Sequence, residues 1–118
     1  MIEITYLEKK QLSLIRHLKI AGEKLFALKI NNELSPIGWH IIHCLYVECI
    51  WIRSQFLDDN ELVSKLKDTA DGINIKPKNR GLNLPNYNCL YKLTKSEFKK
   101  NLIFIQNIKE KKKVSYFI

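Results

Sequence analysis

Apolar residues recur at three- and four-residue steps over the first thirty positions. The repeating positions are Leu7, Leu14, Leu18, Ala21, Leu25 and Leu28. Charged residues lie mostly between them, which is the pattern of an amphipathic α-helix with one face against a core. The sequence therefore predicts a helix over residues 5–28 that is ended by the pair Asn31 and Asn32.

A second helix is predicted over residues 37–56, with Ser35 and Pro36 as its start signal. A serine side chain can accept hydrogen bonds from the free N–H groups of a helix start, and proline suits the first helical position. Apolar side chains cover most of the circumference: Trp39, Ile41, Ile42, Leu45, Tyr46, Val47, Ile50, Trp51 and Ile52. Such a helix belongs in the middle of a bundle or at a subunit interface.

Two more helices complete the expected fold. The first covers residues 59–70 and is stopped by Asp71 and Gly72, after which residues 73–85 form a loop. Asn86 is expected to cap the last helix, whose apolar face includes Tyr91, Phe98, Leu102 and Ile105. No stretch alternates as a strand does, so we expect one all-α helical bundle, a single domain over residues 1–118.

Composition favours a packed domain inside the cell. Of the 118 residues 46% are apolar, and only seven are glycine or proline. The sequence shows no secretion signal and no apolar run of the ~20 residues that span a membrane. Cys44 and Cys49 would point to different sides of one helix, and Cys89 completes an odd set. Reduced thiols fit a reducing compartment, so a cytoplasmic location is expected.

The net charge of +8 is concentrated near the end of the sequence. Residues 92–118 hold eight lysines against Glu97 and Glu110, whereas residues 1–91 are nearly balanced. The tail contains Lys109, Lys111, Lys112 and Lys113. Basic tails can bind phosphates, but an unpatterned charge run is more often a solvated face. Nucleic-acid binding is therefore not expected, although a small basic binding protein stays an alternative.

Two histidines stand out on the second predicted helix. His43 shares a face with apolar neighbours, and His40 lies one turn earlier. An imidazole in such surroundings must satisfy its nitrogens either by hydrogen bonds within the protein or by binding a metal. Two rings at this spacing can share an ion, yet a metal site needs at least one further ligand.

Two charged residues are further candidates. Glu48 lies on another face of the same helix, near Cys44 and Trp51, where a carboxylate either pairs with a basic residue or reaches a cavity. Arg80 lies in a basic loop. Arginine is suited to gripping a carboxylate in two places, although an exposed loop charge is the alternative.

Two segments resemble DinB-like domains. Residues 35–43 (SPIGWHIIH), followed by Glu48 and Trp51, are similar to the second helix of these domains. The closest version is the N-terminal module of the ergothioneine-type sulfoxide synthases, with the pattern SPxxWHxxHxxxxExxW. Residues 79–86 (NRGLNLPN) resemble the RxxxLPS loop that leads into helix three of that family. The resemblance covers nearly the whole chain.

The resemblance implies a four-helix bundle with a three-histidine metal site, which holds iron in the synthases. His43 matches the ligand on helix two, and His40 and Glu48 are candidates for a further ligand or a supporting group. Arg80 falls where the synthases carry basic residues that contact carboxylates of a thiol substrate. The expected cofactor is therefore iron or another divalent metal.

The sequence also departs from the family. The HxxxHxE motif of helix four is missing, and His17 is the only other histidine. We therefore expect the first three main helices of an up-down four-helix bundle plus a short connecting helix, a truncated domain not catalytic alone. The alternative is half of a split metalloenzyme whose partner carries HxxxHxE. We expect a homodimer or a helix-four partner, with contact through Trp39, Trp51 and Ile52.

Overall fold

The computed structural model describes residues 3–116, and side chains up to residue 110. The long helices are α1 (Ile4–Leu25), α2 (Ile37–Cys49) and α5 (Tyr87–Tyr116), and the short ones are α3 (Gln55–Leu57) and α4 (Glu61–Ala70). A π-helical turn, η1 (Ile50–Ser54), joins α2 to α3, and a 3-10 turn, η2 (Pro77–Asn79), lies before α5. The described chain contains no strand, so the predicted all-α helical bundle is confirmed.

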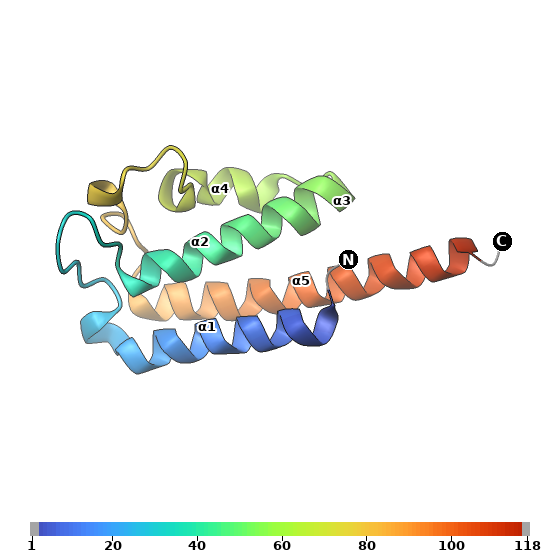
Figure 1. Cartoon of the computed structure of the whole chain (residues 1–118), viewed down its shortest axis with the longest axis horizontal. Helices are drawn as coiled ribbons and strands as arrows, with labels where there is room; N and C mark the ends of the chain where they lie inside the picture. The colour runs from blue at the N-terminus through green and yellow to red at the C-terminus, as the bar shows by residue number, and fades with distance from the viewer. Residues whose placement is uncertain (1–2, 117–118) are drawn as a thin grey trace.

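Successive long elements alternate in direction, and α2 is the central one (Figure 1). It packs against α1, α4 and α5, while α1 and α5 lie side by side beneath it. The molecule measures 55 × 28 × 21 Å, because α5 continues well past the other helices (Figure 1). The prediction that the apolar second helix lies in the middle of a bundle is confirmed.

The core joins the three long helices. Its fully buried apolar side chains include Leu18 from α1, Ile42 and Leu45 from α2, Ile52 from η1 and Leu90 from α5. Each buried side chain of this size stabilises the fold by about 1.5–3 kcal/mol relative to leaving it in water. Within the described residues no helix is long and apolar enough to cross a membrane.

The first helix ends earlier than predicted. Helix α1 stops at Leu25, and Gly22 inside it adopts a positive φ of 67°. This conformation bends the chain and breaks the helical register, so Leu25 and Leu28 are 51% and 55% exposed and do not extend the buried face. The prediction that Leu25 and Leu28 continue the apolar face of this helix is therefore wrong.

Helix α2 begins at the predicted place but by another means. Pro36 is its N-cap, and no side chain caps it, so the predicted role of Ser35 is wrong. The carbonyl of Phe26 instead accepts a hydrogen bond from the N–H of Gly38 at 2.8 Å. This approach favours glycine, because an added Cβ at position 38 would lie only 3.0 Å from that carbonyl oxygen, and the backbone would have to shift slightly.

The continuation of α2 contains an element that the apolar pattern did not predict. The helical path runs to Leu57 and ends at Asp58, which has a φ of 53°. In between, the π-helical turn η1 buries both Ile52 and Arg53. The predicted cap of the last helix is confirmed, since the Asn86 side chain accepts a hydrogen bond from the Cys89 N–H at 2.9 Å.

Candidate functional site

A cleft of about 580 Å³ lies between α2 and the loop that follows α4. Its α2 wall includes Trp39, His40 and His43, and its loop wall includes Asp71 and Arg80. The cleft therefore brings together three of the residues singled out from sequence, His40, His43 and Arg80.

His43 is held in one orientation by its surroundings. Its Nδ1 lies 2.7 Å from the carbonyl oxygen of Ala70, which can only accept, so Nδ1 carries the proton. The imidazole also stacks on Trp39, with ring centroids 4.7 Å apart and planes 10° from parallel. In the neutral ring, the lone pair is then on Nε2. A histidine that binds a metal is commonly held in this way, by a hydrogen bond from its other ring nitrogen. The same hydrogen bond also occurs in a histidine that has only a structural role.

Gly72 makes room for this ring. A Cβ at position 72 would lie 2.8 Å from Cε1 of His43, a separation that real side chains do not tolerate. The backbone thus closes over one edge of the imidazole at the end of α4. The Asp71-Gly72 pair that stops the helix also shapes the cleft.

Arg80 points toward the α2 face that carries His43. Its Nε and Nη2 donate to the carbonyls of Ile75 and Gly72 at 3.0 and 2.8 Å, and its guanidinium lies 4.5 Å from the ring centroid of Trp39. Nη1 has no hydrogen-bond partner among the described residues. The guanidinium is therefore fixed in place with one donor group left for a ligand.

The two sequence motifs meet in the fold. Gly81, with a φ of 89°, follows Arg80, and a Cβ there would lie 2.5 Å from Cγ of Pro36. The start of α2 and the loop before α5 are thus in direct contact. Asp71 orders the same loop by accepting hydrogen bonds from the side-chain amide of Asn74 and the N–H of Ile73, which hold the pKa of its carboxyl below the usual value.

His40 lies on the exposed rim of the cleft. Burial, followed by the nearby His43 and the positive charge of Arg80, lowers the pKa of His40, and a contact with the Ser35 backbone opposes this. A lowered pKa keeps the imidazole neutral at pH 7, which is the form that binds metals and accepts hydrogen bonds.

Glu48 lies in a neighbouring cleft of about 390 Å³ that also touches His43, Cys44 and Trp51. Its Oε1 accepts hydrogen bonds from the amides of Gln11 at 2.5 Å and Asn101 at 3.0 Å. Burial raises the pKa of Glu48 to about 7, against the opposing effect of these two amides. The sequence predicted a basic partner or a cavity, and the carboxyl has the cavity and two amide donors.

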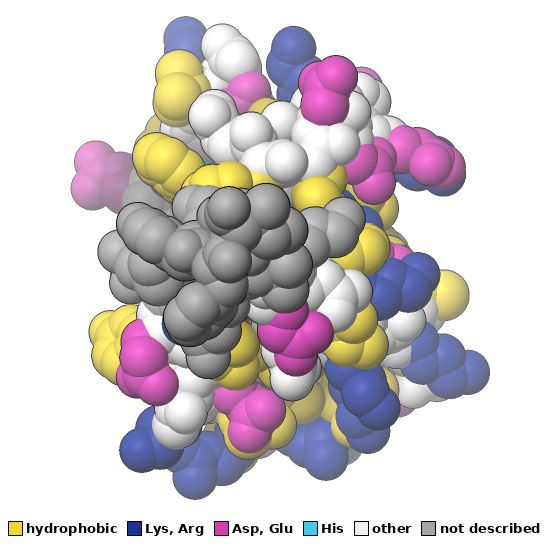
Figure 2. All heavy atoms as spheres, turned by 90° about the vertical axis from the view of Figure 1, so that its right-hand side faces the viewer, with side chains coloured by type: hydrophobic (Ala, Val, Ile, Leu, Met, Phe, Trp, Pro, Cys, Tyr) yellow, Lys and Arg dark blue, Asp and Glu magenta, His cyan; other side chains and the backbone are white. Residues whose placement is uncertain are grey.

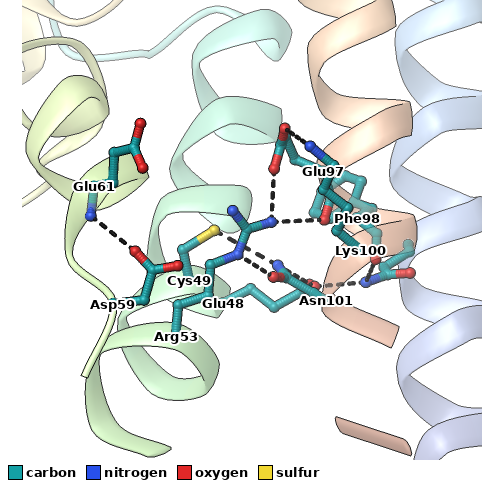
Figure 3. A network of polar contacts seen from close by, with 10 residues as sticks. Glu48, Cys49, Arg53, Asp59, Glu61, Glu97, Phe98, Lys100 and Asn101 are labelled. Carbon is teal, nitrogen blue, oxygen red and sulfur yellow. Dashed lines mark hydrogen bonds and ion pairs between the residues drawn. The ribbon is translucent and has the colours of Figure 1, made fainter. Parts of the chain in front are cut away.

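The Asn101 amide connects Glu48 to a buried ion pair (Figure 3). Its Oδ1 accepts from Arg53 Nε at 2.8 Å, and Arg53 Nη2 pairs with Glu97 at 2.7 Å. Burial alone would raise the pKa of Glu97, but the bonds from Arg53 and Lys100 hold it below its usual value. One polar network thus links α1, α2, η1 and α5.

Sequence reasoning did not find this network, yet a signal was present. Gln11 precedes Ile15 and Leu18 by four and seven residues, and Asn101 falls between Phe98 and Ile105. Both amides therefore occupy core positions of their helices and are nearly inaccessible, with exposures of 4% and 0%. Amides in a core register indicate a buried polar partner.

The donor groups do not complete a metal centre within the described residues. Among residues 3–110, no three or more His, Cys, Asp or Glu side chains converge on one point. The three-histidine site implied by the resemblance is therefore not assembled in this part of the chain. Of the ligand candidates named from sequence, His43 and His40 line the same cleft.

Of the predicted contact residues, the structure exposes one. Trp51 is 58% exposed, whereas Trp39 and Ile52 are buried at 2% and 0%. Trp39 instead supports His43 and donates from its indole nitrogen to the carbonyl of Thr69 at 2.9 Å. Ile52 turns inward through the π-helical turn, so neither side chain is available for contact with a partner.

Figure 2 shows the molecule from the end where α5 extends beyond the other helices, and basic side chains do not form one patch on this face. There, Lys and Arg side chains lie around the rim interleaved with Asp and Glu (Figure 2). Lys109 is partly buried on α5, while the side chains of Lys111, Lys112 and Lys113 lie outside the described residues. The three cysteines are free thiols, with Cys49 buried and Cys89 exposed.

Comparisons of the chain with protein-family models, with curated proteins and with solved structures yield no match.

Proposed function

We propose that this chain is a DinB-like ligand-binding module that supplies one imidazole of a divalent-metal site and is not catalytic alone. The observation that carries the proposal is the fixed orientation of His43. Its Nδ1 is bound to the Ala70 carbonyl, the ring lines a cleft of about 580 Å³, and Nε2 has no hydrogen-bond partner among the described residues. The motifs at residues 35–43 and 79–86 support a relationship to the module of the sulfoxide synthases.

Arg80 gives this cleft a preference for anionic ligands. Its guanidinium is restrained by two carbonyls and by Trp39, so little conformational freedom is lost when Nη1 binds a carboxylate. We propose that a carboxylate-bearing molecule lies beside the metal position. The remaining ligands would come from a second polypeptide, either another copy or a partner carrying HxxxHxE, in the cytoplasm.

The proposal is tested by metal binding to the purified chain. We expect weak binding of Co²⁺ or Zn²⁺, because affinity depends on a complete coordination shell. Paramagnetic Co²⁺ should broaden the imidazole NMR signals of His43 first and of His40 next. His43→Ala should abolish this broadening, and His17→Ala should leave it unchanged, because His17 is exposed on α1.

Two results would contradict the proposal. If Co²⁺ broadens no signal in a His43-dependent manner, the chain supplies no ligand. If stoichiometric iron or zinc survives dialysis and is lost in His43→Ala, the claim that another chain must complete the site is wrong.

A small basic binding protein is the second candidate, carried by the lysine-rich tail. Each phosphate contacted would add about 0.9 to the slope of log affinity against log salt concentration. We expect only weak, non-specific binding of this kind. Tight, salt-dependent nucleic-acid binding that disappears when Lys109, Lys111, Lys112 and Lys113 are neutralised would establish this function instead.

A further inference from the structure

A second polar pocket, separate from the α2 clefts, lies where α4 and α5 flank the π-helical turn η1. Its volume is about 250 Å³. Arg53 lines it from η1, Asp59 and Lys65 from the α4 side, and Glu97 and Lys100 from α5. Figure 3 shows these walls facing one another across Arg53.

Arg53 is buried but not fully paired. Its side chain is only 7% exposed. Nε donates to Asn101 and Nη2 to the carboxylate and carbonyl of Glu97, whereas Nη1 has no hydrogen-bond partner among the described residues. Figure 3 shows Nη1 directed away from Asn101 and Glu97. A buried guanidinium with one open donor group at a pocket is suited to a carboxylate.

The charges of the two walls differ in sign. Where η1 and α5 meet, one carboxylate, Glu97, is shared by Arg53 and Lys100 at 2.7 and 3.1 Å, which leaves an excess positive charge. On the α4 side, Lys65 is paired with Glu61 at 3.2 Å, and Asp59 has no cation within 4.0 Å among the described residues. Asp59 Oδ1 accepts only the backbone N–H of Glu61, so this wall keeps an excess negative charge.

We propose that this pocket binds a small zwitterion of the α-amino-acid class. The carboxylate would bind Nη1 of Arg53 with support from Lys100, and the ammonium group would bind the carboxylate of Asp59. Leu62, which also lines the pocket, would contact an apolar side chain. None of these residues lines the α2 clefts, so the proposal does not depend on the proposed metal function.

The test uses L-leucine as probe with two derivatives that each lack one charge. N-acetyl-L-leucine has no ammonium group, and L-leucine methyl ester has no carboxylate. Backbone NMR signals of the whole chain are followed during titration. We expect L-leucine to give saturable shifts at residues 59–65 and 97–101, and each derivative to bind about tenfold more weakly, since each loses one charged hydrogen bond.

Asp59→Asn is the informative variant, because it keeps the oxygen that accepts the Glu61 N–H while removing the charge. We expect this variant to bind L-leucine about tenfold more weakly than the unmodified chain does. Its affinity for the methyl ester should not exceed that of the unmodified chain, because the ester keeps the ammonium group that Asp59 binds. Asp68→Asn, an exposed position on the same helix, is the matched control and should bind like the unmodified chain. The absence of saturable shifts up to the solubility of leucine would overturn the proposal. Equal binding of N-acetyl-L-leucine and L-leucine would overturn the zwitterion assignment, because the ammonium group would then contribute nothing.

Discussion

At the scale of single residues, the polar side chains inside the bundle carry most of the chemical information. Glu48 is half-buried on the central helix and is bonded by two amides and not by a cation at salt-bridge distance among the described residues. A carboxylate in such a place is costly when charged, and its hydrogen bonds offset only part of that cost. Burial is accordingly the largest cause of the raised pKa, about 7 against an ordinary 4.5.

The raised pKa of Glu48 predicts that the folded state loses stability as the pH rises. Between pH 4.5 and about 7 the folded chain keeps a proton on Glu48 that the unfolded chain has released. The free energy of unfolding therefore falls across this window, by at most about 3 kcal/mol. Glu48→Gln keeps the oxygen that Gln11 and Asn101 bind and removes the charge, so it should be more stable than the unmodified chain at pH 8.

Urea unfolding followed by circular dichroism at pH 5, 6, 7 and 8 measures this effect. The difference in unfolding free energy between Glu48→Gln and the unmodified chain should grow with pH. Glu61→Gln is the control, because Glu61 is exposed and makes only a surface ion pair. Parallel pH curves for Glu48→Gln and the unmodified chain would show that Glu48 is ionised normally in the folded state.

At the scale of elements, the apolar period predicted which segments are helical but not how they are joined. The centre of α2, the end of α4 at Ala70 and the Asn86 cap follow from local sequence. The bend at Gly22 and the π-helical turn η1 do not, because apolar periodicity reports neither a positive φ at a glycine nor an extra residue within a helical turn. Periodicity places a residue on a face and cannot say which neighbour covers that face.

The same limit applies to the candidate site. The sequence placed His40 and His43 on adjacent turns of one helix, and the family resemblance placed Arg80 at a substrate-contacting position. It did not show that the carbonyl of Ala70 fixes His43 or that Asp71 orders the loop wall. These are contacts between α2 and the end of α4, and no local pattern specifies them.

Gly72 tests the link between that helix end and the site. Gly72→Ala places a methyl group 2.8 Å from Cε1 of His43, so the ring or the loop must move. We expect a loss of about 1–3 kcal/mol in the free energy of unfolding, the usual cost of overpacking. The imidazole signals of His43 should shift, and the Co²⁺-dependent broadening should weaken.

Ile73→Ala is the matched control, because Ile73 is the next residue and is 95% exposed. It should leave both stability and the His43 signals nearly unchanged. An alanine at position 72 that leaves the His43 spectrum unaltered would mean that the loop does not hold the ring in solution.

At the scale of the whole molecule, the central helix is covered on three sides and remains partly open on another. Helices α1, α4 and α5 pack against it, while Val47 and Trp51 are 37% and 58% exposed along the cleft that contains Glu48. An exposed apolar strip beside a half-buried carboxyl and an imidazole that lines a cleft is typical of a surface that another polypeptide covers. The proposed partner would complete both the apolar core and the ligand set of His43.

We therefore predict that the chain forms a homodimer, or a complex with a helix-bearing partner, through Trp51. Trp51→Glu should weaken this association by at least about tenfold, which is the effect expected when a central tryptophan is lost from an interface. Light scattering coupled to gel filtration over a range of micromolar concentrations measures the mass, and circular dichroism checks that the variant is folded. Ile20→Glu is the control, because Ile20 is 76% exposed on α1, away from the cleft.

If the unmodified chain alone associates, the second copy is the partner. Co²⁺ should then bind the dimer of the unmodified chain more tightly than it binds the Trp51→Glu variant. If it stays a compact, well-folded monomer and no helix-bearing chain binds it, the assembly proposal is wrong and the strip is an ordinary exposed surface.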